Sequence, residues 1–173
     1  MTSEASPGDA GPLIFGTDGV RDRAGEGFLS PSSVERIVVA TASVLAERER
    51  FREDFPPGRG GTVVVARDTR QSGGVLHESI SRALAGLGHP VADLGVLPTP
   101  GAAWIAASWS EATLGVVISA SHNPAEYNGV KFVAPTGAKI SPEFEKAVSD
   151  AYWKNRPPPY ATRPGDVRDR ARE

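Results

Sequence analysis

The chain has 173 residues, of which 39% are apolar and 23% charged, and its formal net charge is −2 at pH 7. These values fit one globular domain, argue against a disordered or membrane-embedded protein, and give no general attraction to nucleic acid or anionic lipid. The absence of cysteine excludes disulfides, thiolate metal sites and cysteine nucleophiles, and it is compatible with a cytoplasmic location.

Residues 1–11 contain acidic side chains but no basic leader and no apolar run. We therefore expect a disordered tail rather than a signal peptide or a transmembrane segment. The short apolar run Leu13–Phe15 follows and ends at Gly16–Gly19. The polar, glycine-bearing segment Arg21–Gly27 comes next and predicts a loop.

Strand-like and helix-like segments alternate along the rest of the chain. The continuous β-branched or apolar runs at Thr62–Ala66 and Leu114–Ile118 predict strands that are buried on both faces, as in a parallel sheet covered by helices. Apolar residues at spacings of three and four, opened by serine or proline, predict the helices. The expected strands are Thr62–Ala66, Val91–Leu94, Leu114–Ile118 and Val130–Val133, and the expected helices are Pro31 to about Arg50, Val75–Leu87, Thr99–Ser108 and Pro142–Tyr152.

This order predicts an α/β fold, namely a single three-layer α/β/α domain with a mostly parallel mixed sheet and one antiparallel edge strand. We assign that edge to Val130–Val133 and the domain to residues 12–155. Residues 156–173 are expected to be a linker towards an absent second domain, stiffened by Pro157–Pro159. Its end, Arg168–Glu173, has the composition of a first helical turn.

Ligands of open α/β sheets bind at the carboxyl ends of the strands, so the loops that follow strands are the first candidates for function. The loop Arg67–Gly74 places two guanidinium groups and a glycine pair before a helix N-terminus, a combination that favours anions. An ordinary structural interpretation fits it equally: Ser72 caps the helix and Asp68 pairs with Arg70.

The loop Ser119–Pro124 is closed by Asn128–Gly129 and followed at once by Lys131. Within it, Ser121 has a hydroxyl that can accept and return a phosphoryl group, and the ammonium of Lys131 can neutralise the charge on that group. His122 could move a proton or fix the loop by hydrogen bonding.

Each of these residues also has an ordinary structural interpretation. Most exposed serines are solvated turn residues, and a histidine beside Asn-Pro is more often a surface group than a catalyst. Lys131, flanked by Val130 and Phe132, would equally fit the polar face of an edge strand with its ammonium in water.

Three motifs in order resemble those of the α-D-phosphohexomutase family. Ser119–Pro124 with Asn128–Lys131 is similar to the family's phosphoserine loop. Phe15–Arg21 resembles the family's opening motif in the form common in bacterial phosphoglucosamine mutases, and Arg67–Arg70 is the third match. The likeness covers Leu13–Trp153.

The resemblance implies six site residues. One departure is Asp22, which occupies a position where the family usually has glycine. The direction of the Arg21 side chain is therefore left open. The implied catalytic residues are Ser121, Arg21, Lys131 and His122, and the implied phosphate- or substrate-binding residues are Asn123 and Arg70.

The implied reaction is the interconversion of glucosamine 6-phosphate and glucosamine 1-phosphate through a bisphosphate, in amino-sugar and peptidoglycan precursor biosynthesis. The complete enzyme would have four domains and one Mg²⁺, held by phosphorylated Ser121 and by an Asp-x-Asp-x-Asp loop of the second domain. This sequence contains no such triplet, so we expect the chain alone to be inactive.

The implied partners are a phosphosugar and the missing downstream domains, with a homodimer as a further option, but neither nucleic acid nor a membrane. Two alternatives stay open. One is a phosphomannomutase or phosphoglucomutase domain, because the sugar is chosen largely by a loop outside this sequence. The other is a lone, non-catalytic domain that binds phosphosugars.

Overall fold

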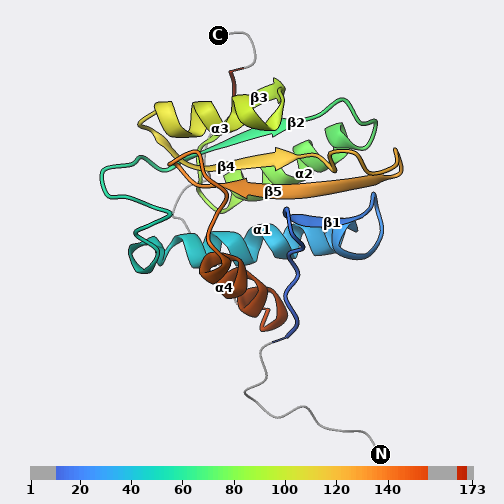
Figure 1. The fold of residues 1–173 in the computed structure, drawn as a ribbon, viewed down its shortest axis with the longest axis horizontal. Helices are drawn as coiled ribbons and strands as arrows, with labels where there is room; N and C mark the ends of the chain where they lie inside the picture. The colour runs from blue at the N-terminus through green and yellow to red at the C-terminus, as the bar shows by residue number, and fades with distance from the viewer. Residues whose placement is uncertain (1–10, 156–166, 171–173) are drawn as a thin grey trace, which may run out of the picture.

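A computed structural model describes residues 11–155 and 167–170. Its centre is a six-stranded sheet in the order β1-β5-β4-β2-β3-β6, with helices on both faces (Figure 1). The elements are β1 (Val20–Arg23), η1 (Gly27–Leu29), α1 (Pro31–Leu45), η2 (Arg48–Arg50), β2 (Thr62–Arg67), α2 (Gly73–Gly86), β3 (Val91–Val96), α3 (Thr99–Ser108), β4 (Ala112–Ile118), β5 (Tyr127–Val133), α4 (Pro142–Trp153) and β6 (Val167–Asp169).

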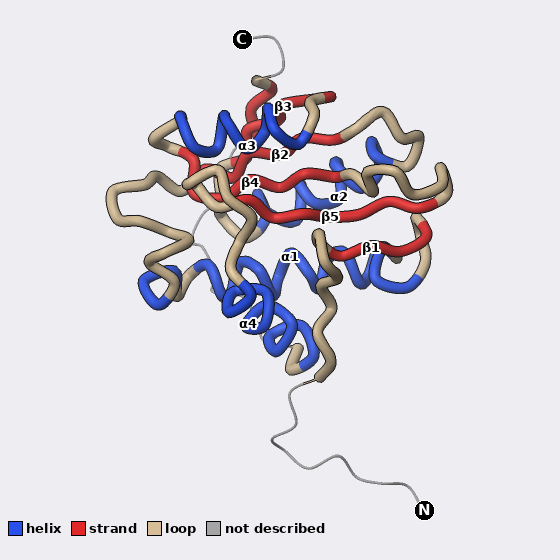
Figure 2. The backbone as a smooth tube through the Cα atoms, viewed as in Figure 1, coloured by secondary structure: helices blue, strands red, loops and turns tan. Residues whose placement is uncertain are grey.

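The sheet separates two hydrophobic cores. Side chains alternate between the faces of β2, so Val63 and Val65 enter the larger core with α1, α2 and α4, whereas Val64 and Ala66 enter the smaller core under α3. Helix α4 packs against α1 on the outer side, and α3 covers the opposite face (Figure 2). The predicted three-layer α/β/α architecture is confirmed.

The antiparallel edge is formed by a different strand from the predicted one. Strand β5 lies between β4 and β1 and is antiparallel to both, so Val130–Val133 is interior and β1 is the edge. The prediction of a loop over Arg21–Gly27 was therefore wrong for its first residues. A short polar strand is stable at an edge because only one side of its backbone needs a partner, and Val20 is its only buried side chain.

The expected helical turn near the C-terminus is also wrong where the structure describes it. Val167–Asp169 forms β6, which pairs in parallel with β3, and the Arg170 amide donates to the Asp93 carbonyl at 2.7 Å. The free edge of β3 offers unpaired backbone groups that a short strand can satisfy. The predictions for residues 1–10, 156–166 and 171–173 lie outside the described residues.

Three segments approach one another beside the carboxyl ends of the central parallel strands. They are the turn Gly16–Gly19 before β1, the loop that follows β2, and the loop that joins β4 to β5. The three motifs found in the sequence lie in these segments and on the adjoining strands, with Arg21 on β1 and Lys131 on β5. No helix among residues 11–155 is long and apolar enough to cross a membrane.

Candidate active site

The loop of residues 119–126, here called the serine loop, joins β4 to β5. The Ser119 amide donates to the Gly129 carbonyl at 2.9 Å, and the Ser121 amide donates to the Ser119 hydroxyl at 3.1 Å. Ser121 has a φ of +54°, a left-handed conformation that costs a non-glycine residue about 1–3 kcal/mol. These contacts hold the serine in that conformation with its side chain exposed.

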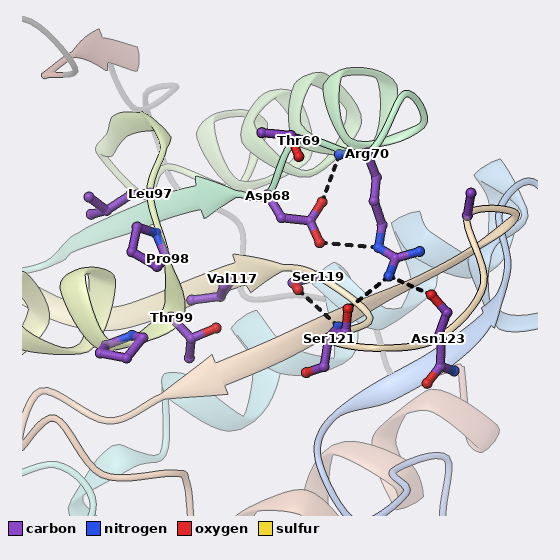
Figure 3. Close-up of a pocket in the computed structure, with 12 residues that line it drawn as sticks. Asp68, Thr69, Arg70, Leu97, Pro98, Thr99, Val117, Ser119, Ser121 and Asn123 are labelled. Carbon is purple, nitrogen blue, oxygen red and sulfur yellow. Dashed lines mark hydrogen bonds and ion pairs between the residues drawn. The ribbon is translucent and has the colours of Figure 1, made fainter.

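The guanidinium of Arg70 clamps the serine loop from the loop after β2 (Figure 3). Its Nε donates to the Asp68 carboxylate at 3.2 Å. An arginine has five N–H donors, and all five of Arg70 are used within the protein. The other four donate to the backbone carbonyls of Ser121 (2.9 Å), Asn123 (2.8 Å), Pro124 (2.6 Å) and Tyr127 (2.9 Å).

A second anchor joins the loop after β2 to the start of β5. The buried Asn128 donates through Nδ2 to the Ser72 hydroxyl at 2.9 Å. The ordinary interpretation of the loop after β2 is thus half right. Asp68 does pair with Arg70, but Ser72, although at the N-cap position of α2, makes no side-chain hydrogen bond to that helix.

Two cations from neighbouring strands contact the serine loop, and one of them contacts the serine hydroxyl. The Lys131 ammonium on β5 lies 3.0 Å from Ser121 Oγ, and Lys131 is only 7% exposed. Arg21 on β1 donates through Nη1 to Asn123 Oδ1 at 3.3 Å. The interpretation of Lys131 as a solvated side chain on an edge strand is wrong, because β1 completes the sheet beyond it.

Asp18 lies between these cations, and the sequence prediction did not assign it a role. Its Oδ2 is 2.6 Å from Lys131 Nζ and 2.9 Å from Arg21 Nη2. Burial alone would raise the pKa of Asp18, but hydrogen bonds and charges from Lys131 and Arg21 outweigh burial and hold that pKa below its usual range. The only signal in the sequence was the position of Asp18 inside the Gly16–Gly19 turn.

Two glycines permit this close assembly. Gly19 has a φ of +85°, and a Cβ there would lie 2.4 Å from the Val130 carbonyl oxygen. A Cβ on Gly129 would lie 2.8 Å from the Ser119 carbonyl oxygen. The turn that carries Asp18 therefore packs directly on β5, and β5 packs directly on the serine loop.

Asp22, which departs from the family pattern, does not turn the Arg21 side chain away from the site. Its carboxylate accepts hydrogen bonds from the amides of Arg23 (2.8 Å) and Phe28 (2.9 Å), so it caps the turn after β1. The Arg21 guanidinium points the other way, to Asp18 and Asn123.

Ser121 lines two open cavities. One, of about 550 Å³, is bounded by the loops after β2 and β3 and by Ser119 (Figure 3). The other, of about 690 Å³, is bounded by the Phe15–Gly19 segment, Arg21 and the exposed His122. A ligand can therefore reach the serine hydroxyl from either side of the serine loop.

Comparison with known proteins agrees with this geometry. Residues 12–158 match the family model described as phosphoglucomutase/phosphomannomutase, alpha/beta/alpha domain I. The chain belongs to the phosphoglucomutase/phosphomannomutase family. The resemblance noted in the sequence is thereby confirmed.

Among curated relatives of this family, the phosphoglucosamine mutase of Rhodococcus erythropolis is 41% identical over 158 residues, which are 91% of this chain and 34% of the relative. The phosphoglucosamine mutase of Rubrobacter xylanophilus is 46% identical over 134 residues, which are 78% of this chain and 27% of the relative. The chain thus spans about a third of the length of such relatives.

Solved structures of the same family share the fold. A phosphoglucomutase/phosphomannomutase family protein from Burkholderia thailandensis has a TM-score of 0.72 at 27% identity, over 91% of this chain and 32% of the other. A putative phosphomannomutase from Thermus thermophilus has a TM-score of 0.70 at 31% identity, over 93% of this chain and 33% of the other.

The described part of this phosphoglucomutase/phosphomannomutase domain brings no three His, Cys, Asp or Glu side chains together as metal ligands. The carboxylate of Asp18, beside Ser121, is already bound to two cations. Residues 11–155 and 167–170 therefore do not form a metal centre by themselves.

Proposed function

We propose that this chain is the phosphoserine-bearing domain of a phosphohexomutase, and that Ser121 carries the phosphoryl group. In the complete enzyme, which acts in the cytoplasm, the reaction interconverts glucosamine 6-phosphate and glucosamine 1-phosphate through a bisphosphate. One observation carries the proposal. The hydroxyl of Ser121 lies exposed on a clamped, left-handed loop residue, 3.0 Å from the buried ammonium of Lys131.

The donating step uses phosphorylated Ser121 and a hydroxyl of the phosphosugar. The P–Oγ bond of the phosphoserine breaks, a P–O bond to the sugar forms, and the proton of the sugar hydroxyl ends on Ser121 Oγ. Lys131 stabilises the negative charge that develops on Oγ as it leaves. The sugar bisphosphate then returns its other phosphoryl group to Ser121 by the reverse step.

Arg21 is the second group that binds the phosphoryl oxygens. Its Nε is buried and has no hydrogen-bond partner in the described part of the chain, so this arginine retains unused donors. Asn123 orients it by accepting from Nη1. The exposed imidazole of His122 lines the same cavity as Arg21 and Ser121, and we assign to it the transfer of the proton from the sugar hydroxyl to Ser121 Oγ.

Arg70 has a different role from Arg21 in this proposal. The sequence suggested a phosphate or substrate contact, but all five donors of Arg70 bind protein oxygens. Its part in the reaction is therefore to position the serine loop, and Arg21 and Lys131 supply the charge.

Mg²⁺ fits this site through the phosphoserine. Phosphate oxygens are hard ligands of the kind that Mg²⁺ prefers, and a bound Mg²⁺ would neutralise charge on the transferring group. The remaining ligands are assigned to a downstream domain, since the chain covers only about a third of its relatives. The partners are accordingly a phosphosugar and those domains.

The choice of glucosamine rests on the names of the curated relatives at 41% and 46% identity. A phosphomannomutase is the second candidate, because a structure of that title is 31% identical. The test is an assay of this chain joined to its downstream domains on the 6-phosphates of glucosamine, mannose and glucose. Fastest turnover of the glucosamine substrate is expected, and loss of all turnover in Ser121→Ala. Preference for mannose would overturn the glucosamine assignment.

A further inference from the structure

Asp18 and Ser121 both contact one cation, Lys131. The Asp18 carboxylate and the Ser121 hydroxyl both contact the Lys131 ammonium, at 2.6 Å and 3.0 Å. The same carboxylate oxygen also binds Arg21 at 2.9 Å. A phosphoryl group on Ser121 would place anionic oxygens beside these two cations, where the carboxylate now lies.

The charges decide which anion the cations can hold. With an unmodified serine, Lys131 and Arg21 carry two positive charges against the single negative charge of Asp18. A phosphoserine adds about −1.5 to −2 at pH 7. The phosphate alone would nearly neutralise both cations, whereas phosphate and carboxylate together would leave an excess of negative charge in a partly buried site.

Burial explains why a carboxylate is needed when the phosphate is absent. Lys131 is 7% exposed, and a buried ammonium without a counter-ion is unfavourable. Asp18 removes that penalty in the unmodified protein. Its pKa, which Lys131 and Arg21 hold below the usual range, is consistent with a tightly engaged carboxylate.

The Asp18 carboxylate is held in a way that allows it to move away from Lys131 and Arg21. Its side chain is 44% exposed, and in the described part of the chain its carboxylate contacts only Lys131 and Arg21. The turn backbone beside it is held separately, because Lys139 donates to the Thr17 carbonyl at 2.9 Å. By contrast, the carboxylate of Asp22 is tied to two backbone amides. Rotation of one side chain is enough to release Asp18 into solvent.

We propose that Asp18 is a displaceable counter-ion. It binds Lys131 and Arg21 while Ser121 is unmodified, and a phosphoryl group on Ser121 displaces it from these two cations. This inference rests on the proposed function of Ser121. Because the carboxylate competes with the phosphate, it weakens the hold of the protein on the phosphoryl group and favours donation to the sugar.

The test is a thermodynamic cycle on the 173-residue chain, with phosphoserine installed at position 121 by amber-codon suppression. Thermal unfolding is measured for wild type and Asp18→Asn, each with serine or phosphoserine. We expect phosphoserine to raise the Tm of Asp18→Asn by several degrees more than that of wild type, since only the variant lacks a competing anion. Asp22→Asn is the matched control and should respond to phosphoserine as wild type does. Equal responses in wild type and Asp18→Asn would overturn the proposal.

A measurement on the wild-type chain covers the case in which Asp18→Asn does not fold. The carboxyl carbon of Asp18 is titrated by ¹³C NMR with serine and with phosphoserine at position 121. Displacement predicts that the pKa of Asp18 rises to its ordinary range or above in the phosphorylated chain. A pKa that stays low would show that Asp18 remains on the cations. Neither experiment needs a sugar or turnover, so failure of the proposed reaction is detected separately by the activity assay.

Discussion

The ammonium of Lys131 lies 3.0 Å from the hydroxyl of Ser121, and Lys131 stands on β5, whose outer neighbour in the sheet is a strand that the sequence did not reveal. Strand β1 pairs with β5 from Val20↔Val130 to Arg23↔Tyr127 and covers the side of β5 that would otherwise be open. It also brings Arg21 to the serine loop. The edge of the sheet is thus part of the candidate active site.

Replacement of Lys131 should remove most of the activity of the complete enzyme. Lys131→Met keeps an aliphatic chain but loses the charge that faces the leaving oxygen, so kcat should fall by about 10²- to 10³-fold. Steady-state kinetics measures the effect. Lys146→Met is the control, because Lys146 is exposed and pairs with Asp150 on α4, away from the serine loop. Wild-type kcat in Lys131→Met would contradict this role.

Arg70 should act through the serine loop rather than through substrate affinity. Arg70→Ala removes five hydrogen bonds, each worth about 0.5–1.5 kcal/mol. Because two of them are exposed to solvent, the free energy of unfolding should fall by an amount near the lower end of their sum, about 2.5–4 kcal/mol. In the complete enzyme, kcat should fall more than KM rises. Arg70→Lys should not rescue kcat, because an ammonium has three donors and no planar fork.

The matched control for this prediction is Arg82→Ala, since Arg82 is an exposed partner of Glu78 on α2. It should change the free energy of unfolding by less than about 0.5 kcal/mol. Urea denaturation measures both variants. A large rise in KM with unchanged stability in Arg70→Ala would instead favour a direct phosphate contact.

Substitutions at Gly19 and Gly25 measure the stability cost of close packing separately from the cost of an unfavourable backbone conformation. Both have a positive φ, +85° and +86°, but a Cβ would clash with the Val130 carbonyl only at Gly19. Gly25→Ala should cost about 1 kcal/mol of unfolding free energy. Gly19→Ala should cost about 1–3 kcal/mol more, because the turn must move away from β5. Equal losses in urea denaturation would show that the turn yields without cost.

The stability that Asp18 contributes should depend on pH in one direction. Its pKa is lowered in the folded chain from an ordinary value of 3.8, so its contribution is present above that value and is lost as pH falls through the folded pKa. The difference in unfolding free energy between wild type and Asp18→Asn should therefore be constant from about pH 5 to 7 and shrink below about pH 4. Urea denaturation across this range measures it. A difference that grows towards low pH would refute the ion-pair assignment.

The sequence predicted those parts of the fold that depend on local pattern. Val63–Ala66 is apolar throughout because it is buried on both faces, and such a run is recognisable without its neighbours. Strand β1 is not recognisable in this way, since its polar residues are stabilised by a partner far along the chain. The same reason explains why the burial of Lys131 was missed.

In the candidate site, too, some features could be predicted from the local sequence and others depend on residues far along the chain. The motif around Ser121 is contiguous, so its chemistry could be inferred from the residue types. The role of Arg70 could not, because its partners are backbone carbonyls, which leave no trace in the side-chain sequence. Asp18 acquires its position only when β1 and β5 pair.

The central claim is that Ser121 carries the phosphoryl group, and intact mass spectrometry tests it most directly. The chain is purified from cells together with its downstream domains, as wild type, Ser121→Ala and the neighbouring control Ser119→Ala. The account predicts one added phosphoryl group on wild type and on Ser119→Ala, which is kept after turnover of glucosamine 6-phosphate because the sugar bisphosphate returns a phosphoryl group, and none on Ser121→Ala. A wild-type protein without phosphate, or a phosphoryl group that persists in Ser121→Ala, would contradict it.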